Sequence, residues 1–325
     1  MNYNFCTLFD KNYLTRGLAL YESLLKFFPD FKIWMLCMDS ESYEMLKKLN
    51  LDKIIPLKLE DIEDEKLLSV KNTRTTSEYC WMMSSSLPLY ILEKIGVDMI
   101  TYLDADLYFF QPLTAIYDEF ANNSIMIIPH WFPEENRHQE KTSGIYNVGM
   151  MIFRNDENGL KCLRWWKEKV IEWCFNRYEE GKYGDQLYLN DWPNRFDGVY
   201  ILKNHGANVA SWNIKNYSFF KRQGKLQLKV ISSGKEFPLI FYHYHGLKFF
   251  LNFFKKIKPY PITVLQKEIY KKYIEGLQDA YEKIWGFNPN WSYGFSPKIS
   301  IMRMIKQILV KFFEKWKTRI TEFVK

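Results

Sequence analysis

The sequence predicts an α/β fold followed by a helical C-terminal extension. In the first hundred of its 325 residues, short apolar runs alternate with stretches of helical periodicity, which is the rhythm of a βαβα fold. Around residues 255–295 the pattern turns helical and aromatic, and from Ser296 onward the charge character changes. We therefore expect a main domain over residues 1–255 and a helical extension over residues 256–325.

Each expected element follows from the spacing of its apolar residues. In the first part of the chain, this spacing predicts strands at residues 5–9, 31–38 and 54–59 and helices at residues 14–28 and 43–49. Residues 60–78 are polar and lack an apolar period, so we expect a loop there that leads into a helix at residues 79–94. Further strands are expected at residues 99–103, 124–129, 149–153, 199–202 and 239–243, with an amphipathic helix at residues 158–179.

The charge distribution argues against a nucleic-acid partner. The formal net charge is +7, but residues 296–325 hold eight Lys and Arg against two Glu, so the rest of the chain is almost neutral. A nucleic-acid enzyme would spread its basic residues along a groove. The apolar residues of this basic tail recur mostly at spacings of three and four, which predicts an amphipathic helix on an anionic membrane. The alternative is that its apolar side packs on the main domain.

Three further features indicate where the protein acts. The five cysteines are odd in number and show no CxxC spacing, which favours a reducing compartment. The N-terminal stretch has no basic region before its apolar run, and no 18 apolar residues follow one another. We expect a cytoplasmic protein without signal peptide or membrane span, held peripherally on the cytoplasmic face of the cell membrane by its tail.

Asp104 and Asp106 form the main candidate for a metal site. They follow the strand expected at residues 99–103 and have apolar residues on both sides. Acidic residues at the carboxyl end of such a strand project into the crevice where α/β folds bind ligands. Two hard oxygen donors suit Mg²⁺ or Mn²⁺, with a diphosphate supplying further ligands. The alternative is a solvated turn at a strand end.

His243 and His245 follow another apolar strand, together with Gly246 and Lys248. An imidazole can complete a metal site of mixed nitrogen and oxygen donors, the glycine permits close approach of the backbone, and the lysine can meet a phosphate. The alternative is a pair of histidines hydrogen-bonded at a strand end. The pattern leaves open which histidine binds a metal.

Two weaker patterns place polar side chains beside glycine. They are Asn147 with Gly149, and Asp185 with Gln186 after a glycine. The amides can fix sugar hydroxyls and the carboxylate can accept hydrogen bonds from them. Taken alone, each pattern is more often the chemistry of a turn.

All four patterns occur in the order and approximate spacing seen in glycosyltransferase family 8 and its bacterial relatives, which have the GT-A fold. The resemblance runs from Phe5 to Gly246. It implies nucleotide contacts from Asp10 and Tyr13, metal ligands at Asp104, Asp106 and His243, donor-sugar contacts at Asn147, Gly149 and Asp185, and Gln186 on the reactive face of the sugar. Asp185 and Gln186 are thereby the expected catalytic residues.

The sequence departs from this family in two places. The family continues its HxxG motif as HxxGxxKPW, whereas Lys248 comes one residue early here and two phenylalanines replace Pro-Trp. The family's basic residue in the helix before the metal motif would fall near Cys80, so Arg74 or Lys71 is expected to replace it. We expect Gly246, Lys248 and Arg74 to contact the nucleotide or its phosphates.

The resemblance implies a metal-dependent glycosyltransferase that moves a hexose from a nucleoside-diphosphate sugar, in particular a UDP-hexose, to a glycan or lipid-linked acceptor. It implies Mn²⁺ or Mg²⁺ as cofactor, retention of configuration, a role in bacterial surface-polysaccharide biosynthesis, and a mixed, mainly parallel twisted sheet. Because Gln186 is a poor nucleophile, an ion-pair route on one face of the sugar fits better than double displacement.

Two other classes are alternatives. A phosphatase of the haloacid dehalogenase type also uses a DxD at a strand end, but it prefers Thr or Val where this chain has Tyr108, and no later acidic pair follows at a matching place. A non-catalytic, membrane-associated sugar-binding protein on the same fold would be expected to lack a metal ligand. All candidate ligands are present in this chain.

Overall fold

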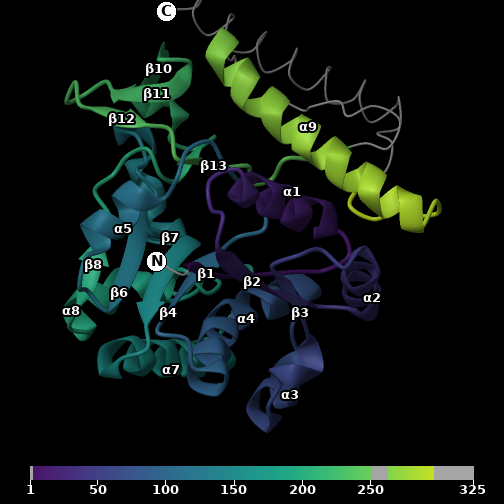
Figure 1. Ribbon diagram of the computed structural model, residues 1–325. Coiled ribbons are helices and arrows are strands. Elements are labelled where there is room, and N and C mark those ends of the chain that lie inside the picture. Colours follow the sequence, from purple (N-terminus) through teal and green to yellow (C-terminus); the bar gives the residue numbers. More distant parts are fainter. Residues whose placement is uncertain (1–2, 250–262, 296–325) are drawn as a thin grey trace, which may run out of the picture. The chain divides into compact units, whose positions relative to one another are not determined.

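The computed structural model describes residues 3–249 and 263–295 of the chain. The chain divides into two compact units. The first consists of Met1–Leu247 and Lys258–Gly294, and the second of Lys248–Ile257 and Phe295–Lys325. In the first unit, Figure 1 shows a central sheet with helices on both of its faces. The expected boundary near residue 255 and the basic tail over residues 296–325 lie outside the described residues.

A seven-stranded sheet forms the centre of the first unit. Its strand order is β3-β2-β1-β4-β7-β6-β8. The strands are β1 (Tyr3–Phe9), β2 (Phe31–Cys37), β3 (Ile54–Lys58), β4 (Met99–Leu103), β6 (Ile125–Pro129), β7 (Tyr146–Arg154) and β8 (Val199–Ile201). Of these strands, β7 alone runs antiparallel to its neighbours. The expected α/β fold with a mixed, mainly parallel sheet is confirmed.

Helices cover both faces of this sheet, and alternate strand residues point to opposite faces. Phe5 belongs to a core cluster with residues of α1 (Leu14–Leu25), α2 (Ser40–Leu49), α5 (Thr114–Phe120) and α9 (Val264–Phe287). Its neighbour Cys6 belongs to the other cluster, with residues of α3 (Glu65–Lys71), α4 (Thr76–Tyr90), α7 (Glu157–Glu172) and α8 (Trp192–Arg195). A four-residue helix, α6 (Glu140–Ser143), lies outside both clusters.

The loop expected over residues 60–78 is wrong in part, because α3 lies within it. The Asp64 side chain caps this helix by accepting a hydrogen bond from the Leu67 amide at 2.9 Å. Leu67 is the one buried residue of a seven-residue helix, so no apolar period could announce it. Helix α4 begins three residues earlier than expected because Thr75 and Glu78 form a capping box, with the Thr75 amide donating to the Glu78 carboxylate at 2.8 Å.

A small sheet at the carboxyl end of β4 brings distant parts of the chain together. It contains β5 (Leu107–Phe109), β13 (Phe241–His243) and β9 (Val209–Ala210), with β13 in the middle. The β5 strand follows β4 after three residues and pairs with β13 so that Leu107 lies opposite His243. This pairing places the Asp-Ala-Asp segment beside the histidine strand. A third sheet, β10 (Tyr217–Arg222), β11 (Lys225–Val230) and β12 (Glu236–Pro238), is antiparallel.

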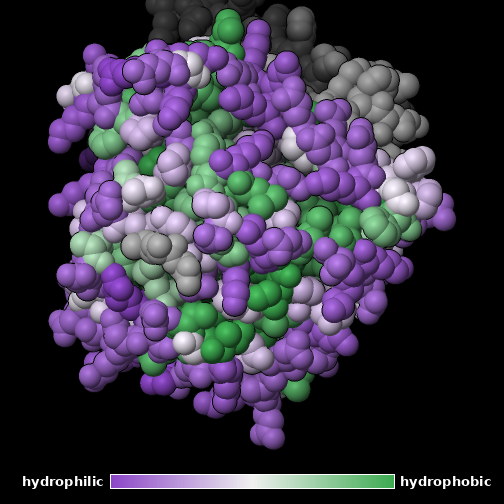
Figure 2. Space-filling view, in the orientation of Figure 1, coloured by the Kyte–Doolittle hydropathy of each residue, from purple (hydrophilic) through white to green (hydrophobic). Residues whose placement is uncertain are grey.

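Helix α9 packs on α1, as Figure 1 shows. Gly276 of α9 also permits a close approach to β5, because a Cβ there would lie 3.0 Å from the Tyr108 ring. The helical pattern expected around residues 255–295 is thus seen over Val264–Phe287. Figure 2 shows a surface that is hydrophilic over most of its area, with hydrophobic patches between the polar side chains. Within the described residues, no helix has the length and apolar character needed to cross a membrane.

Candidate active site

A cavity of about 840 Å³ opens where β1 and β4 end. Its walls come from segments far apart in the chain, and its volume is typical of small-molecule sites. The wall residues that the sequence singled out are Asp10, Tyr13, Asp104, Asp106, Asn147, Asp185, Gln186, His243 and His245. Among the described residues that line this cavity there is no lysine or arginine. The structure therefore brings nine of the expected polar residues to one place.

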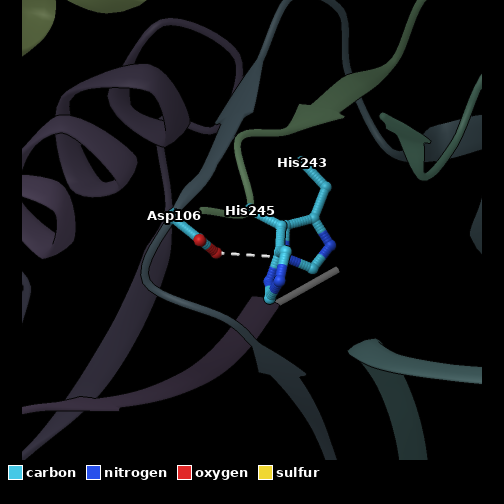
Figure 3. A group of neighbouring side chains, drawn as sticks. All are labelled: Asp106, His243 and His245. Carbon is cyan, nitrogen blue, oxygen red and sulfur yellow. Dashed lines mark ion pairs between the residues drawn. The ribbon is translucent and has the colours of Figure 1, made fainter. Parts of the chain in front are cut away.

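Asp104, Asp106 and His243 form the centre of the cavity wall. The His243 Nε2 atom lies 3.1 Å from Asp106 Oδ1 and 3.6 Å from Asp104 Oδ2. Figure 3 shows the first of these ion pairs. Desolvation and the neighbouring Asp106 raise the pKa of Asp104 to about 6, against the opposing effect of His243. Burial also raises the pKa of Asp106, but the His243 imidazolium outweighs it and holds that pKa below its ordinary value.

The ring of His243 is fixed from behind by Asn208. The Asn208 amide nitrogen donates to the Pro129 carbonyl at 3.2 Å, so its oxygen faces His243 Nδ1 at 3.4 Å. Nδ1 must then carry a proton, and Nε2 is the nitrogen that faces the carboxylates. Metal-ligating histidines commonly donate their other ring N–H to an oxygen acceptor in the same way.

Gly149 makes room for the same histidine. A Cβ atom at this position would lie 2.5 Å from Asn147 Oδ1 and 2.8 Å from His243 Nδ1, both closer than real contacts allow. The Gly149 carbonyl accepts a hydrogen bond from the Asp104 amide at 2.8 Å. Gly149 therefore lies directly against the Asn147 and His243 side chains, and a side chain at position 149 would displace them.

His245 lies at the exposed edge of this group. Its ligand atom and those of Asp106 and His243 all lie within 4.8 Å of one another. The ring of Trp212 stands against both imidazoles, with centroid distances of 5.1 Å to His243 and 6.0 Å to His245. Desolvation in the cavity wall, together with the nearby His243, lowers the pKa of His245.

Asp185 is the buried carboxylate on the other side of the cavity. The hydroxyl of Ser84, on α4, donates to Asp185 Oδ2 at 2.6 Å. Burial raises the pKa of Asp185 to about 7, and the charge of Asp104 adds to the effect, while the Ser84 hydrogen bond opposes it. Gln186, the next residue, accepts a hydrogen bond from the Asn147 side-chain amide at 3.4 Å, which joins an expected donor-sugar contact to the residue expected on the reactive face.

Asp10 and Tyr13 lie at the end of β1 and the start of α1. Asp10 Oδ2 accepts from the side-chain amide of Asn12 at 2.8 Å, which fixes the carboxylate in the turn. The half-exposed ring of Tyr13 lies under the Arg16 guanidinium at 4.2 Å. Its exposed face is therefore held in position at the cavity wall.

The cavity wall does not include three expected contacts of the first compact unit, Gly149, Arg74 and Gly246. The Arg74 guanidinium stacks on the Phe175 ring at 3.9 Å and donates to the Ile171 carbonyl. Arg74 lies just before α4, and its side chain contacts the end of α7 and the segment that follows α7. Gly246 occupies a turn with a φ of 68° and has nothing within 4 Å of its Cβ position. Lys248 belongs to the second compact unit, and its phosphate contact stays a prediction.

Some site residues carried no functional signal in the sequence. Asn208 and Trp212 flank the two-residue strand β9, and only its pairing with β13 in the folded chain shows that they contact the histidines. Ser84 did carry a weak signal, because three consecutive serines in an otherwise apolar helix are costly to bury without partners.

Comparisons with known proteins show which sequences and folds this chain resembles. The family model described as glycosyl transferase family 8 matches residues 4–195. The chain is 31% identical over 305 residues to the uncharacterized protein YfnF of Bacillus subtilis, which covers 90% of this chain and 97% of that protein. Among solved structures, the galactosyltransferase LgtC in complex with donor and acceptor sugar analogues aligns with a TM-score of 0.50 and 14% identity, over 91% of this chain and 98% of that one.

The glycosyltransferase GlyE of Streptococcus pneumoniae aligns with a TM-score of 0.49 and 16% identity, over 92% of this chain and 66% of that one, so the chain spans just under two thirds of GlyE. The family match extends over more than half of the chain and includes the first strand, the two aspartates after β4, and Gln186. The chain therefore belongs to glycosyl transferase family 8 and is a glycosyltransferase with the GT-A fold.

Proposed function

We propose that this glycosyltransferase moves a hexose from a nucleoside-diphosphate sugar, in particular a UDP-hexose, with retention of configuration and with a divalent cation. The observation that carries this proposal is that Asp104, Asp106 and His243 share one cavity with Asn147, Asp185 and Gln186. The proposed metal ligands thus adjoin amide and carboxyl groups of the kind that bind sugar hydroxyls.

The donor set fits Mn²⁺ or Mg²⁺, since two carboxylates face one imidazole whose other nitrogen is held by Asn208. When bound, the cation supplies Lewis-acid stabilisation of the diphosphate leaving group. The cavity wall supports this dependence, because its described residues include four aspartates and no lysine or arginine. Without a cation these side chains would repel a diphosphate.

The remaining wall residues would position the donor. Asp10 and Tyr13 would bind the nucleotide. The Asn147 amide and the Asp185 carboxyl group, which accepts from Ser84, would form hydrogen bonds with the sugar hydroxyls. The Gln186 amide, joined to Asn147, would lie at the face of C1 where positive charge develops. The amide is a poor nucleophile, so the proposal favours departure and attack on the same face over a covalent intermediate.

The acceptor and the cellular location belong to the same proposal. The basic amphipathic pattern of residues 296–325 supports peripheral contact with an anionic membrane from the cytoplasmic side, where a lipid-linked acceptor would lie. A glycan of the bacterial surface is the expected product. Because the chain belongs to glycosyl transferase family 8, we do not favour a phosphatase of the dehalogenase type. Because Asp104, Asp106 and His243 all line the cavity, we do not favour a non-catalytic sugar-binding protein.

Thermal unfolding of the full chain against a panel of UDP-, GDP- and TDP-hexoses, each with Mn²⁺ and again with chelator, tests the donor class. We expect a UDP-hexose to raise the melting temperature only with Mn²⁺, and to be hydrolysed slowly. NMR of the released sugar gives the anomeric configuration, which should be that of the donor. A panel in which no nucleotide sugar stabilises the protein with Mn²⁺ would remove the proposal.

A further inference from the structure

The second histidine of the His-Tyr-His segment lies where it can reach the cation proposed above. Figure 3 shows the His243 and His245 side chains next to each other, with Asp106 beside them. Their ligand atoms and that of Asp106 all lie within 4.8 Å of one another. Metal–ligand bonds of 2.0–2.2 Å place neighbouring donors roughly 3 to 4 Å apart, so small side-chain rotations are enough to bring these donors to one ion.

The backbone that carries His245 is fixed to the aspartate segment. The amide of Tyr244, between the two histidines, donates to the Asp106 carbonyl at 3.0 Å. The Tyr244 ring is buried and stacks on Tyr273 at 3.8 Å, and its hydroxyl donates to the Ile269 carbonyl at 2.7 Å. Because Tyr244 is anchored on the core side, its two neighbours point the other way, toward the cavity.

Trp212 limits the motion of His245 on the open side. Its ring stands edge-on to both imidazoles and lines the same cavity. His245 is therefore exposed yet held beside Asp106 and His243, which differs from a histidine that extends freely into solvent.

We propose that His245 is a second imidazole ligand of the cation, in addition to His243 and the carboxylates, and that this donor set selects Mn²⁺, Co²⁺ or Zn²⁺ over Mg²⁺. The inference rests on the metal site of the proposed function and deepens it. Imidazole nitrogen binds borderline transition metals well, whereas Mg²⁺ favours oxygen donors and keeps its waters. Each added imidazole therefore widens the difference in affinity between the two groups of metals.

The test measures metal binding to the full chain without any nucleotide. Metal is removed with a chelator, Co²⁺ is titrated while its visible absorption is recorded, and Mg²⁺ is titrated by calorimetry. The variants are His245→Gln, the matched control His138→Gln, which changes an exposed histidine outside the cavity wall, and Asp106→Asn. Thermal unfolding of each variant checks that the fold is retained, which we expect for His245→Gln and His138→Gln because both side chains are exposed.

We expect His245→Gln to lower Co²⁺ affinity by at least about tenfold and to change the Co²⁺ spectrum, with Mg²⁺ affinity nearly unchanged and His138→Gln equal to the wild type. If Asp106→Asn weakens Co²⁺ binding but His245→Gln leaves both affinity and spectrum as in the wild type, His245 is not a ligand and this inference is wrong. If the wild-type chain binds neither metal, the metal site of the proposed function fails as well.

Discussion

The buried Asp185 predicts a dependence of stability on pH that an isosteric variant should remove. Its pKa in the folded protein is about 7, against an ordinary value near 4 in an unfolded chain. Between these values the folded protein keeps a proton on Asp185 that the unfolded chain has released. This residue's contribution to stability is therefore full below about pH 4 and is lost as the pH rises through about 7.

The size of the effect follows from the shift. Three pKa units correspond to about 4 kcal/mol of unfolding free energy across this pH range, as an upper figure. Asp185→Asn keeps the size of the side chain and an oxygen that can accept from Ser84, but it cannot titrate. We expect the free energy of unfolding of the wild type, relative to this variant, to fall by a few kcal/mol between pH 4.5 and pH 7.5.

Urea unfolding at several pH values in the presence of chelator measures this difference directly. Asp118→Asn serves as the matched control, because it removes an exposed aspartate that does not line the cavity. Its pH profile should be parallel to that of the wild type. A profile for Asp185→Asn that is also parallel to the wild type, within about 0.5 kcal/mol, would show that burial does not hold Asp185 neutral.

Two further predictions concern Gly149 and Gln186. Gly149→Ala should lower Mn²⁺ affinity by at least about tenfold while the protein still folds, because its Cβ would lie 2.8 Å from His243 Nδ1; a Mn²⁺ titration that matches the wild type would contradict this role. Gln186→Ala should lower kcat more than donor affinity, whereas Asn147→Ala should also weaken donor binding, and steady-state kinetics with donor titrations separate the two. Unchanged turnover in the Gln186 variant would assign the reactive face to another residue.

Much of the fold could be predicted because the sheet strands are apolar and are separated by helical periods. The same spacing led to Asp104, since the residue after a buried strand of an α/β sheet lies at its ligand-binding edge. Helix α3 could not be predicted in this way, because a single buried residue, Leu67, gives no period. Its polar cap and short length make it look like the loops around it.

The site was predictable where a residue's own neighbours in sequence decide its place, and less so where contacts between distant segments do. Asp106 and His243 meet because β5 pairs with β13, which the order of motifs in the related family could indicate. Asn208 and Trp212 reach the histidines from either end of β9, a strand of two residues that is too short to give a periodic pattern. Arg74 was expected in the site because of its charge. In the folded chain its guanidinium stacks on the Phe175 ring, and Arg74 does not line the cavity.

In the function proposed above, the carboxylates after β4 hold a cation that binds the donor's diphosphate. Calorimetric titration of UDP-hexose into the wild type and into Asp106→Asn, each with Mn²⁺ and with chelator, tests it most directly. We expect the wild type to bind the donor only with Mn²⁺ and the variant to bind it in neither condition, because Asp106 lies 3.1 Å from the third ligand, His243. If Asp106→Asn binds the donor with wild-type affinity and the same Mn²⁺ dependence, Asp106 does not hold the cation that binds the diphosphate.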